Sequence, residues 1–176
     1  MEDVQGKVDH RGIAIQRVGV SQIRLPVRIE TKSGGFQSVL ATIRMTVDLP
    51  QEYKGTHMSR FLEVMHPWSD KVLSSRAVGE ILVEMRERLQ AETAHFEMDF
   101  EYFITKIAPI SKKQGLLGIH CRLEGTLGNE KEDFVLQVAV PVTSLCPCSK
   151  EISTYGAHNQ RSEIRVRVRY DHQDRY

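Results

Sequence analysis

The chain has 176 residues, 40% hydrophobic and 27% charged, a composition typical of a folded globular protein rather than a disordered one. Its 24 lysines and arginines nearly balance its 23 aspartates and glutamates, and this net charge of +1 argues against nucleic acid as a partner, because nucleic-acid-binding proteins usually carry a clear basic excess. The nearest approach to an unbroken apolar run, residues 134–142, is far shorter than the ~20 residues of a membrane-spanning helix, so no membrane association is expected.

The redox setting and location follow from the cysteines and the N-terminus. Three cysteines, an odd number, do not make a disulfide framework. The acidic start Met1-Glu2-Asp3 lacks the apolar core of a signal peptide. We therefore expect a soluble, reduced, cytoplasmic protein.

The first predicted element is an antiparallel hairpin. Hydrophobic and polar residues alternate over 23–30 and again over 39–49, the period of two that is typical of half-buried strands. Between the two runs, Thr31–Gly35 supplies the glycines that a tight turn needs. Residues 1–19 show no sustained period and are expected to form an N-terminal arm.

Helical spacing follows the hairpin. Apolar residues predict a short helix over 58–65, which must end before Pro67 because the residue before a proline is pushed out of the helical region. Ser74 or Ser75 can cap a second helix, whose apolar stripe runs over 78–89.

Strand periodicity then returns over 97–104 and 117–123, and the apolar run 134–141 fits a central strand. Strands, two helices and strands again predict an α+β fold, an antiparallel sheet with both helices on one face.

The last predicted strand covers 164–170 and alternates apolar residues with arginines. Its arginines could bind phosphates or face the acidic side chains of a neighbouring strand, and we expect the latter, since opposite charges on adjacent strands attract. The residues concerned are Arg165, Arg167 and Arg169 on one strand and Glu97, Asp99 and Glu101 on the other.

The segment most informative about chemistry is Cys146-Pro147-Cys148 with His158. It follows an apolar strand and so lies at a sheet end, where loops often carry function. Thiolate and imidazole groups bind zinc and other first-row divalent metals. A structural site needs four protein ligands and this segment offers at most three, whereas three ligands with an open position for water are the catalytic pattern. The spacing does not match the usual zinc motifs, and the alternative is that both cysteines are buried hydrophobes and His158 caps a loop.

Two further features have weaker functional interpretations. His57 and Arg60 lie at a loop-to-helix junction, where a helix N-terminus attracts anions; an ordinary helix start explains them equally well. Cys121 shares the apolar face of its strand and is predicted to be a core residue.

Residues 55–61 (GTHMSRF) and 144–161 (SLCPCSKEISTYGAHNQR) together resemble the type IB GTP cyclohydrolase I family, and the similarity runs over the whole chain from Asp3. The resemblance implies a hydrolase of cyclic amidine C–N bonds. Such an enzyme converts GTP and water to 7,8-dihydroneopterin triphosphate and formate, the first step of folate and pterin synthesis.

The resemblance also implies roles for single residues. Cys146 matches the family's catalytic, metal-binding cysteine and His158 its histidine ligand, whereas Cys148 is not expected to be a principal ligand. The metal is a divalent ion, with zinc, manganese and iron all left open. The third metal ligand and the glutamate that anchors guanine are expected beyond Tyr176.

The triphosphate of GTP needs cationic partners. The candidates from this sequence are His57, Arg60, Lys150 and Arg161.

The fold implied by the resemblance is the tunnelling fold, in tandem units that assemble into a homo-oligomer, a tetramer with sites at subunit interfaces. On this basis residues 1–19 form the arm, 20–145 the first unit, 146–161 the metal-site loop and 162–176 the first strand of an incomplete second unit.

Two other functions remain open. One is a different tunnelling-fold enzyme acting on a purine or pterin, such as a nitrile reductase, with Cys146 as a nucleophile. The other is a non-catalytic module in which the Cys-Pro-Cys loop holds a structural zinc ion.

Overall fold

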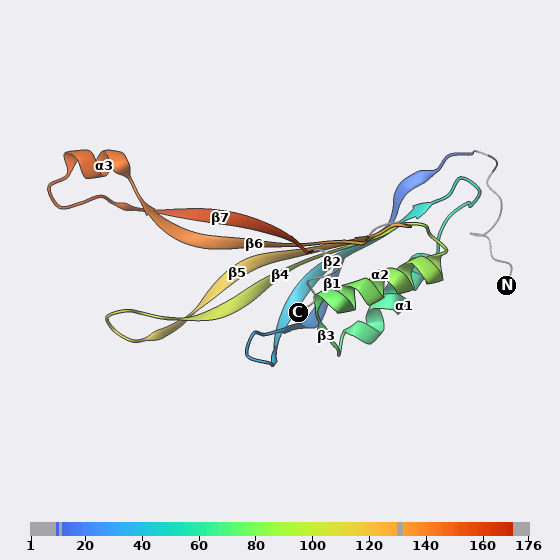
Figure 1. Ribbon diagram of the computed structural model, residues 1–176, viewed down its shortest axis with the longest axis horizontal. Coiled ribbons are helices and arrows are strands. Elements are labelled where there is room, and N and C mark those ends of the chain that lie inside the picture. The colour runs from blue at the N-terminus through green and yellow to red at the C-terminus, as the bar shows by residue number, and fades with distance from the viewer. Residues whose placement is uncertain (1–9, 11, 130–131, 171–176) are drawn as a thin grey trace.

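The computed structural model describes residues 10, 12–129 and 132–170. In this part of the chain, seven strands form one sheet in the order β3-β1-β2-β4-β5-β6-β7, and helices α1 and α2 lie on one of its faces (Figure 1). Neighbouring strands are antiparallel except β1 and β3, which are parallel. The predicted α+β architecture is confirmed.

The element bounds are as follows. The strands are β1 (Ile15–Glu30), β2 (Phe36–Leu49), β3 (Val72–Leu73), β4 (Ala94–Ile107), β5 (Gln114–Leu127), β6 (Glu132–Leu145) and β7 (Asn159–Tyr170). The helices are α1 (Met58–Met65), the 3-10 helix η1 (His66–Trp68), α2 (Ser75–Leu89) and α3 (Pro147–Ile152).

The predicted first hairpin is present, but its first strand starts earlier than the alternation indicates. Gly34 adopts a left-handed φ of 82° in the turn, as a tight hairpin requires. The strand begins at Ile15, so the part of the expected arm from residue 15 onward is strand, and residues 1–9 and 11 lie outside the described residues. Register shifts between Ile15 and Val18 and between Val20 and Ile23 break the period of two, which hides the strand from a pattern search.

Both predicted helices are confirmed. The first, α1, ends at Met65, directly before η1, which contains Pro67. Ser74 caps α2, because its hydroxyl accepts a hydrogen bond of 3.3 Å from the amide of Ala77. The apolar stripe of α2 is buried against the sheet and, with the inner sides of β2 and β4, makes the core.

Helix α2 packs closely over a glycine of the sheet. At Gly125 of β5 an added Cβ would lie 2.8 Å from Val78 Cγ1 and 3.0 Å from Leu82 Cδ1. The missing side chain therefore lets α2 approach the sheet. The helices do not cover the sheet beyond β5, and β6 is half-buried along most of its length although β5 and β7 flank it on both sides.

The arginines of β7 pair with acidic side chains, as predicted, but the predicted partners on β4 are wrong. Arg167 pairs with Glu124 at 2.6 Å, Arg169 with Asp133 at 2.8 Å, and Arg165 with Glu163 on its own strand at 2.6 Å. Strands β5 and β6 lie between β7 and β4, so the acidic residues of β4 are out of reach.

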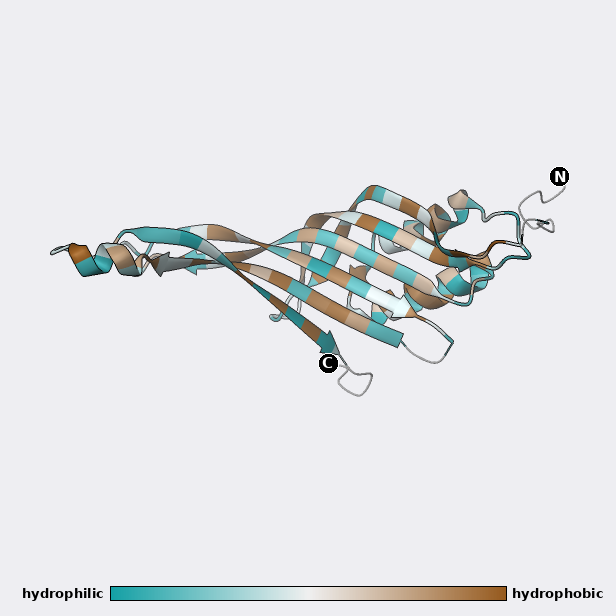
Figure 2. Cartoon of the chain, turned by 90° about the horizontal axis from the view of Figure 1, so that it is seen from above, coloured by the Kyte–Doolittle hydropathy of each residue, from teal (hydrophilic) through white to brown (hydrophobic). Residues whose placement is uncertain are grey.

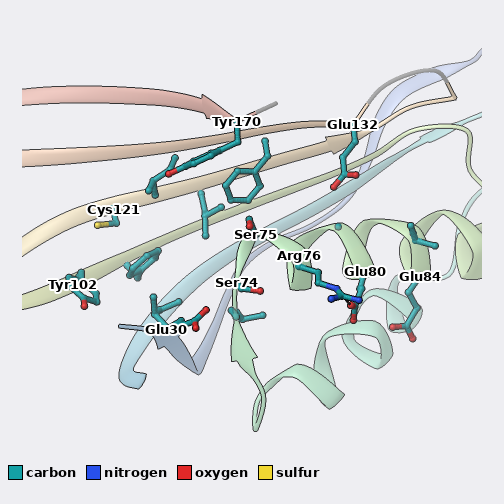
Figure 3. A pocket seen from close by; sticks show the side chains of 18 of the residues that line it. Glu30, Ser74, Ser75, Arg76, Glu80, Glu84, Tyr102, Cys121, Glu132 and Tyr170 are labelled. Atoms are coloured by element: carbon teal, nitrogen blue, oxygen red, sulfur yellow. Dashed lines mark ion pairs between the residues drawn. The ribbon is translucent and has the colours of Figure 1, made fainter. Parts of the chain in front are cut away.

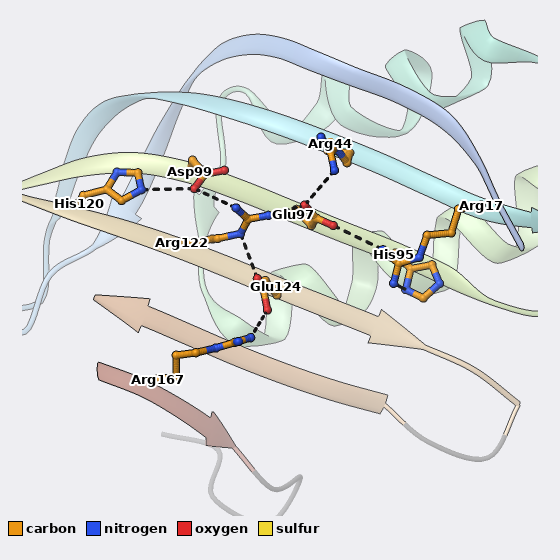
Figure 4. A network of polar contacts seen from close by, with 9 residues as sticks. All are labelled: Arg17, Arg44, His95, Glu97, Asp99, His120, Arg122, Glu124 and Arg167. Atoms are coloured by element: carbon orange, nitrogen blue, oxygen red, sulfur yellow. Dashed lines mark hydrogen bonds and ion pairs between the residues drawn. The ribbon is translucent and has the colours of Figure 1, made fainter. Parts of the chain in front are cut away.

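The acidic residues of β4 belong instead to a polar network on the face of the sheet that points away from the helices (Figure 4). Glu97 accepts a hydrogen bond of 2.6 Å from Arg122 and also pairs with Arg17 and Arg44. Asp99 lies 3.4 Å from His120. Figure 2 shows the alternation of polar and apolar residues along the strands that separates this face from the core.

His95 lies at one end of this network. Its Nδ1 is 3.3 Å from the Arg17 guanidinium and 3.0 Å from the Thr126 hydroxyl. Burial, and next the charge of Arg17, lower the pKa of His95 from its ordinary 6.5, against the opposite pull of Glu97 and Asp48.

Over the described ranges, no helix has the length and apolar character needed to cross a lipid bilayer.

Candidate functional site

The Cys-Pro-Cys segment and His158 lie together at the tip of the β6–β7 hairpin, at the opposite end of the sheet from α1 (Figure 1). The two strands pair as far as Leu145 and Asn159, so Cys146 directly follows β6 and His158 directly precedes β7. The amide of Cys146 donates a hydrogen bond of 3.2 Å to the carbonyl of His158. The eleven residues between the two in sequence, 147–157, thus form a closed loop.

The β6–β7 hairpin continues beyond the point where β6 pairs with β5. Strand β6 pairs with β5 only as far as Ala139, whereas its pairing with β7 continues to Leu145. The loop is therefore carried on a two-stranded arm.

A short helix that the sequence prediction missed, α3, shapes the loop. Cys146 is its N-cap residue and Pro147 occupies the first turn, where the missing amide hydrogen of proline costs no helical hydrogen bond. The amide of Lys150 donates to the carbonyl of Cys146 at 3.2 Å and closes the first turn. The proline directly after an extended residue was the available signal for this helix.

Ser149, on α3, joins the two candidate ligands. Its hydroxyl lies 2.7 Å from His158 Nδ1, and the side-chain amide of Gln160 lies 3.5 Å from Nε2 of the same ring. The sequence prediction named neither residue, because a serine in a loop carries no distinctive spacing.

The thiol of Cys146 differs from the core thiol of Cys121. The amide and hydroxyl of Ser149 lower the pKa of Cys146, and Cys148 adds to the effect. The side chain of Cys146 makes no capping hydrogen bond to α3. Burial, and next Glu101, raise the pKa of Cys121 to about 11. Since thiolates rather than thiols bind metals, Cys146 is the better ligand, and Cys121 is confirmed as a core residue.

The donor chemistry of the loop fits a divalent metal, but it supplies only part of a coordination shell. Cys146 is partly exposed and His158 is exposed, so both are accessible to an ion. Within residues 10, 12–129 and 132–170, no three His, Cys, Asp or Glu side chains cluster closely enough to hold a metal. A metal held by Cys146 and His158 would take its other ligands from elsewhere.

The four candidates for binding phosphate fall into two groups. Lys150 on α3 and Arg161 on β7 lie at the cysteine end of the molecule, and both are exposed. His57 is the N-cap residue of α1, and Arg60 donates a hydrogen bond of 3.0 Å to the carbonyl of Arg88 at the end of α2. One chain does not bring the two groups together (Figure 1).

A groove of about 830 Å³ lies between α2 and strands β5, β6 and β7 (Figure 3). Its floor is apolar and includes Phe100, Leu123 and Phe134, while Glu80 and Glu84 of α2 line its edge. No residue of the Cys146–His158 loop lines this groove, so the two features are separate.

Comparison with known proteins supports the resemblance seen in the sequence. A family model described as type I GTP cyclohydrolase FolE2 matches residues 1–176. The chain is 50% identical over 171 residues to the GTP cyclohydrolase FolE2 of Nitrosococcus oceani, which covers 97% of this chain and 64% of that protein.

Two further relatives carry the same name. The GTP cyclohydrolase FolE2 of Syntrophotalea carbinolica is 52% identical over 169 residues, 96% of this chain and 63% of that protein. That of Geobacter sulfurreducens is 50% identical over 170 residues, 97% of this chain and 65% of that protein. The chain thus spans a little under two thirds of the length of these curated relatives.

Proposed function

Because the chain belongs to the FolE2 family of type I GTP cyclohydrolases, we propose that its protein hydrolyses and rearranges GTP to 7,8-dihydroneopterin triphosphate and formate, the first step of folate synthesis. The matched family is FolE2 of the type I enzymes, and the narrower subtype IB expected from the sequence stays part of the proposal. The observation that carries the proposal is the loop that holds Cys146 beside His158, within the segment that first pointed to this family.

We propose that Cys146 and His158 are two ligands of a divalent ion, zinc, manganese or iron. When bound, such an ion lowers the pKa of a coordinated water from 15.7 towards ~7 and so supplies hydroxide for hydrolysis of the guanine ring. The chain's own contribution is to join the backbones of Cys146 and His158 at the tip of the hairpin, where His158 is exposed and Cys146 is partly exposed. The third ligand and the glutamate that anchors guanine lie outside the described residues in this proposal.

In our proposal, basic side chains near the loop bind the triphosphate. Lys150 and Arg161 are exposed at the same end of the molecule as Cys146 and suit this role, because phosphate oxygens pair well with ammonium and guanidinium groups. In our proposal His57 and Arg60 act on the loop of a second copy of the chain, since within one copy they lie at the other end of the sheet.

A site shared between copies requires a homo-oligomer, which we propose to be a tetramer. We further propose that its subunits have the tunnelling fold and that the protein works in the reduced environment of the cytoplasm. We also propose tandem units, with residues 20–145 as the first and 162–176 opening a second. In this proposal β7 opens the second unit and pairs with β6, the last strand of the first.

The test is an assay of GTP turnover by the complete encoded protein with manganese, read out as the fluorescence of the oxidised pterin. Cys146→Ala should abolish turnover and leave the melting temperature nearly unchanged, because its side chain lies outside the core. The matched control is Cys121→Ala, which should keep turnover but lose about 1 kcal/mol of stability by leaving a small cavity.

Removal of the metal separates this proposal from its rivals. Turnover should vanish with a chelator and return with the ion. Activity that survives complete metal removal would instead support the reading in which Cys146 is a nucleophile, as in a nitrile reductase. A four-coordinate ion without exchangeable water, in a protein that does not turn over GTP, would support a structural zinc module.

A further inference from the structure

We infer that Ser149 is a positioning residue that fixes the ring of His158 with its proton on Nδ1, so that Nε2 is presented to the metal ion. The inference rests on the proposed function, in which His158 is a metal ligand. It concerns a residue that the sequence prediction did not name.

The contacts of the imidazole determine which nitrogen carries the proton. The Gln160 side-chain nitrogen lies 3.5 Å from Nε2 and can only donate a hydrogen bond, so this contact favours an Nε2 that accepts and carries no proton. A neutral ring then carries its proton on Nδ1, which donates it to the Ser149 hydroxyl oxygen at 2.7 Å. The short contact fixes the ring, and the long one leaves the Nε2 lone pair available for a stronger partner.

The position of Ser149 is itself fixed by the backbone of the loop. Hydrogen bonds of 3.2 Å join Cys146 to His158 across the hairpin and Lys150 to Cys146 within α3. Ser149 is half-buried between them, whereas its neighbours Cys148 and Lys150 are exposed. The hydroxyl therefore belongs to the same closed unit as both ligands.

This arrangement is the one that metal-binding histidines need. A ligating imidazole usually donates its other N–H to a nearby oxygen, which sets the tautomer and the direction of the ring, and removal of that partner typically lowers metal affinity 10–100-fold. Here the oxygen is a hydroxyl from the helix that Cys146 caps, so one short segment supplies a ligand and supports the other.

A merely structural role for Ser149 would be to close the loop. That role predicts lower thermal stability for Ser149→Ala but no change in the ring of His158 or in metal binding. The experiment therefore measures the tautomer and the metal affinity directly, in addition to turnover.

The complete encoded protein is compared with three variants. Ser149→Ala removes the hydroxyl and Ser149→Thr keeps it. Ser153→Ala is the matched control, because Ser153 lies in the same loop and its hydroxyl accepts a hydrogen bond from the amide of Tyr155 rather than from His158.

The first measurement is a long-range proton–nitrogen NMR correlation of the His158 ring in metal-free protein at pH 8. We expect the Nδ1–H tautomer in the wild type, in Ser149→Thr and in Ser153→Ala, and a shift towards Nε2–H in Ser149→Ala. A wild-type ring already in the Nε2–H form overturns the inference without reference to any variant.

The second measurement is the affinity for Co²⁺, from chelator competition followed by the visible spectrum of the bound ion. We expect Ser149→Ala to bind 10–100-fold more weakly than the wild type, and Ser149→Thr and Ser153→Ala to bind within about threefold of it. Equal affinity in Ser149→Ala, or no metal binding by the wild type, overturns the inference.

These outcomes distinguish the two proposals. If the wild type turns over GTP but Ser149→Ala keeps both tautomer and affinity, the inference fails and the proposed function stands. If the wild type shows the Nδ1–H tautomer and the serine-dependent affinity but produces no pterin, the inference stands and the proposed function fails.

Discussion

Three cysteines of this chain occupy three different environments. Cys121 packs in the core beneath the groove, and its raised pKa keeps it a neutral thiol. Cys148 is exposed on α3, while Cys146 interacts with the amide and hydroxyl of Ser149 that favour its thiolate. Residue type alone thus does not decide reactivity, because burial and neighbouring dipoles act on the same thiol in opposite directions.

His95 shows the same principle for an imidazole. Folding lowers its pKa below 6.5, so the unfolded chain takes up the proton more readily than the folded one. The neutral His95 ring therefore stabilises the folded state above pH 6.5, and this stabilisation is lost as the pH falls through the lowered folded-state pKa.

We predict that His95→Gln reduces the loss of thermal stability between pH 7.5 and 5.0. Its neighbours Arg17, Thr126, Glu97 and Asp48 stay in place, so the difference from the wild type reports the imidazole. Melting curves across this range provide the measurement. The control is His66→Gln, at an exposed position in η1, and equal acid sensitivity of His95→Gln and the wild type would contradict the prediction.

At the scale of elements, the contact of α2 with β5 depends on the absence of one side chain. Val78 and Leu82 are fully buried over Gly125, with no room for a methyl group. Gly115 lies on the same strand with nothing within 4 Å of the position where its Cβ would be. Alanine substitutions at these two glycines therefore distinguish the effect of a steric clash with α2 from the effect of a changed backbone freedom, within one strand.

We predict that Gly125→Ala destabilises the fold by about 1–3 kcal/mol, because α2 must shift away from the sheet. Gly115→Ala should be neutral or stabilise by up to about 1 kcal/mol, since it restricts the unfolded chain without a clash. Urea denaturation of both variants provides the free energies of unfolding. Equal midpoints for the two would show that α2 does not pack against β5 as described.

At the scale of the whole molecule, the residues proposed to share a site lie at opposite ends of the sheet (Figure 1). Cys146 and His158 are at the tip of the β6–β7 arm, and His57 begins α1. A site that uses both regions must therefore combine two copies of the chain.

Complementation tests this arrangement. We predict that co-assembled Cys146→Ala and His57→Ala proteins regain a substantial fraction of wild-type turnover, about a quarter in an evenly mixed dimeric contact, although each alone is at least 100-fold reduced. In the mixed pair, one site combines the intact loop of one copy with the intact α1 of the other. Co-assembled Cys146→Ala and His158→Ala should stay inactive, because both loops are damaged; recovery in this control, or none in the first pair, would contradict a shared site.

How much the sequence predicts depends on whether a signal is periodic. The helices over 58–65 and 75–89 and the first hairpin follow from spacing, capping and turn residues, and all three are confirmed. The start of β1 escapes prediction because its bulges disrupt the alternation. The partners of Arg165, Arg167 and Arg169 depend on strand order, which alternation within a strand does not encode.

The candidate site divides in the same way. Cys146 and His158 are visible from their residue types, and the hairpin register then places them side by side. Ser149 becomes visible only when α3 turns its hydroxyl towards His158, a three-dimensional relation without a sequence signal of its own.

The two-stranded arm has a mechanical consequence. From Val140 to Leu145 strand β6 is supported by β7 alone, six residues that extend about 20 Å at ~3.3 Å per residue. If this two-stranded arm bends by about 5° at its base, its tip moves by about 2 Å while the internal geometry of the tip stays unchanged. Substitutions near Ala139, where the arm leaves the sheet, would therefore alter the aim of the Cys146–His158 pair without touching either ligand.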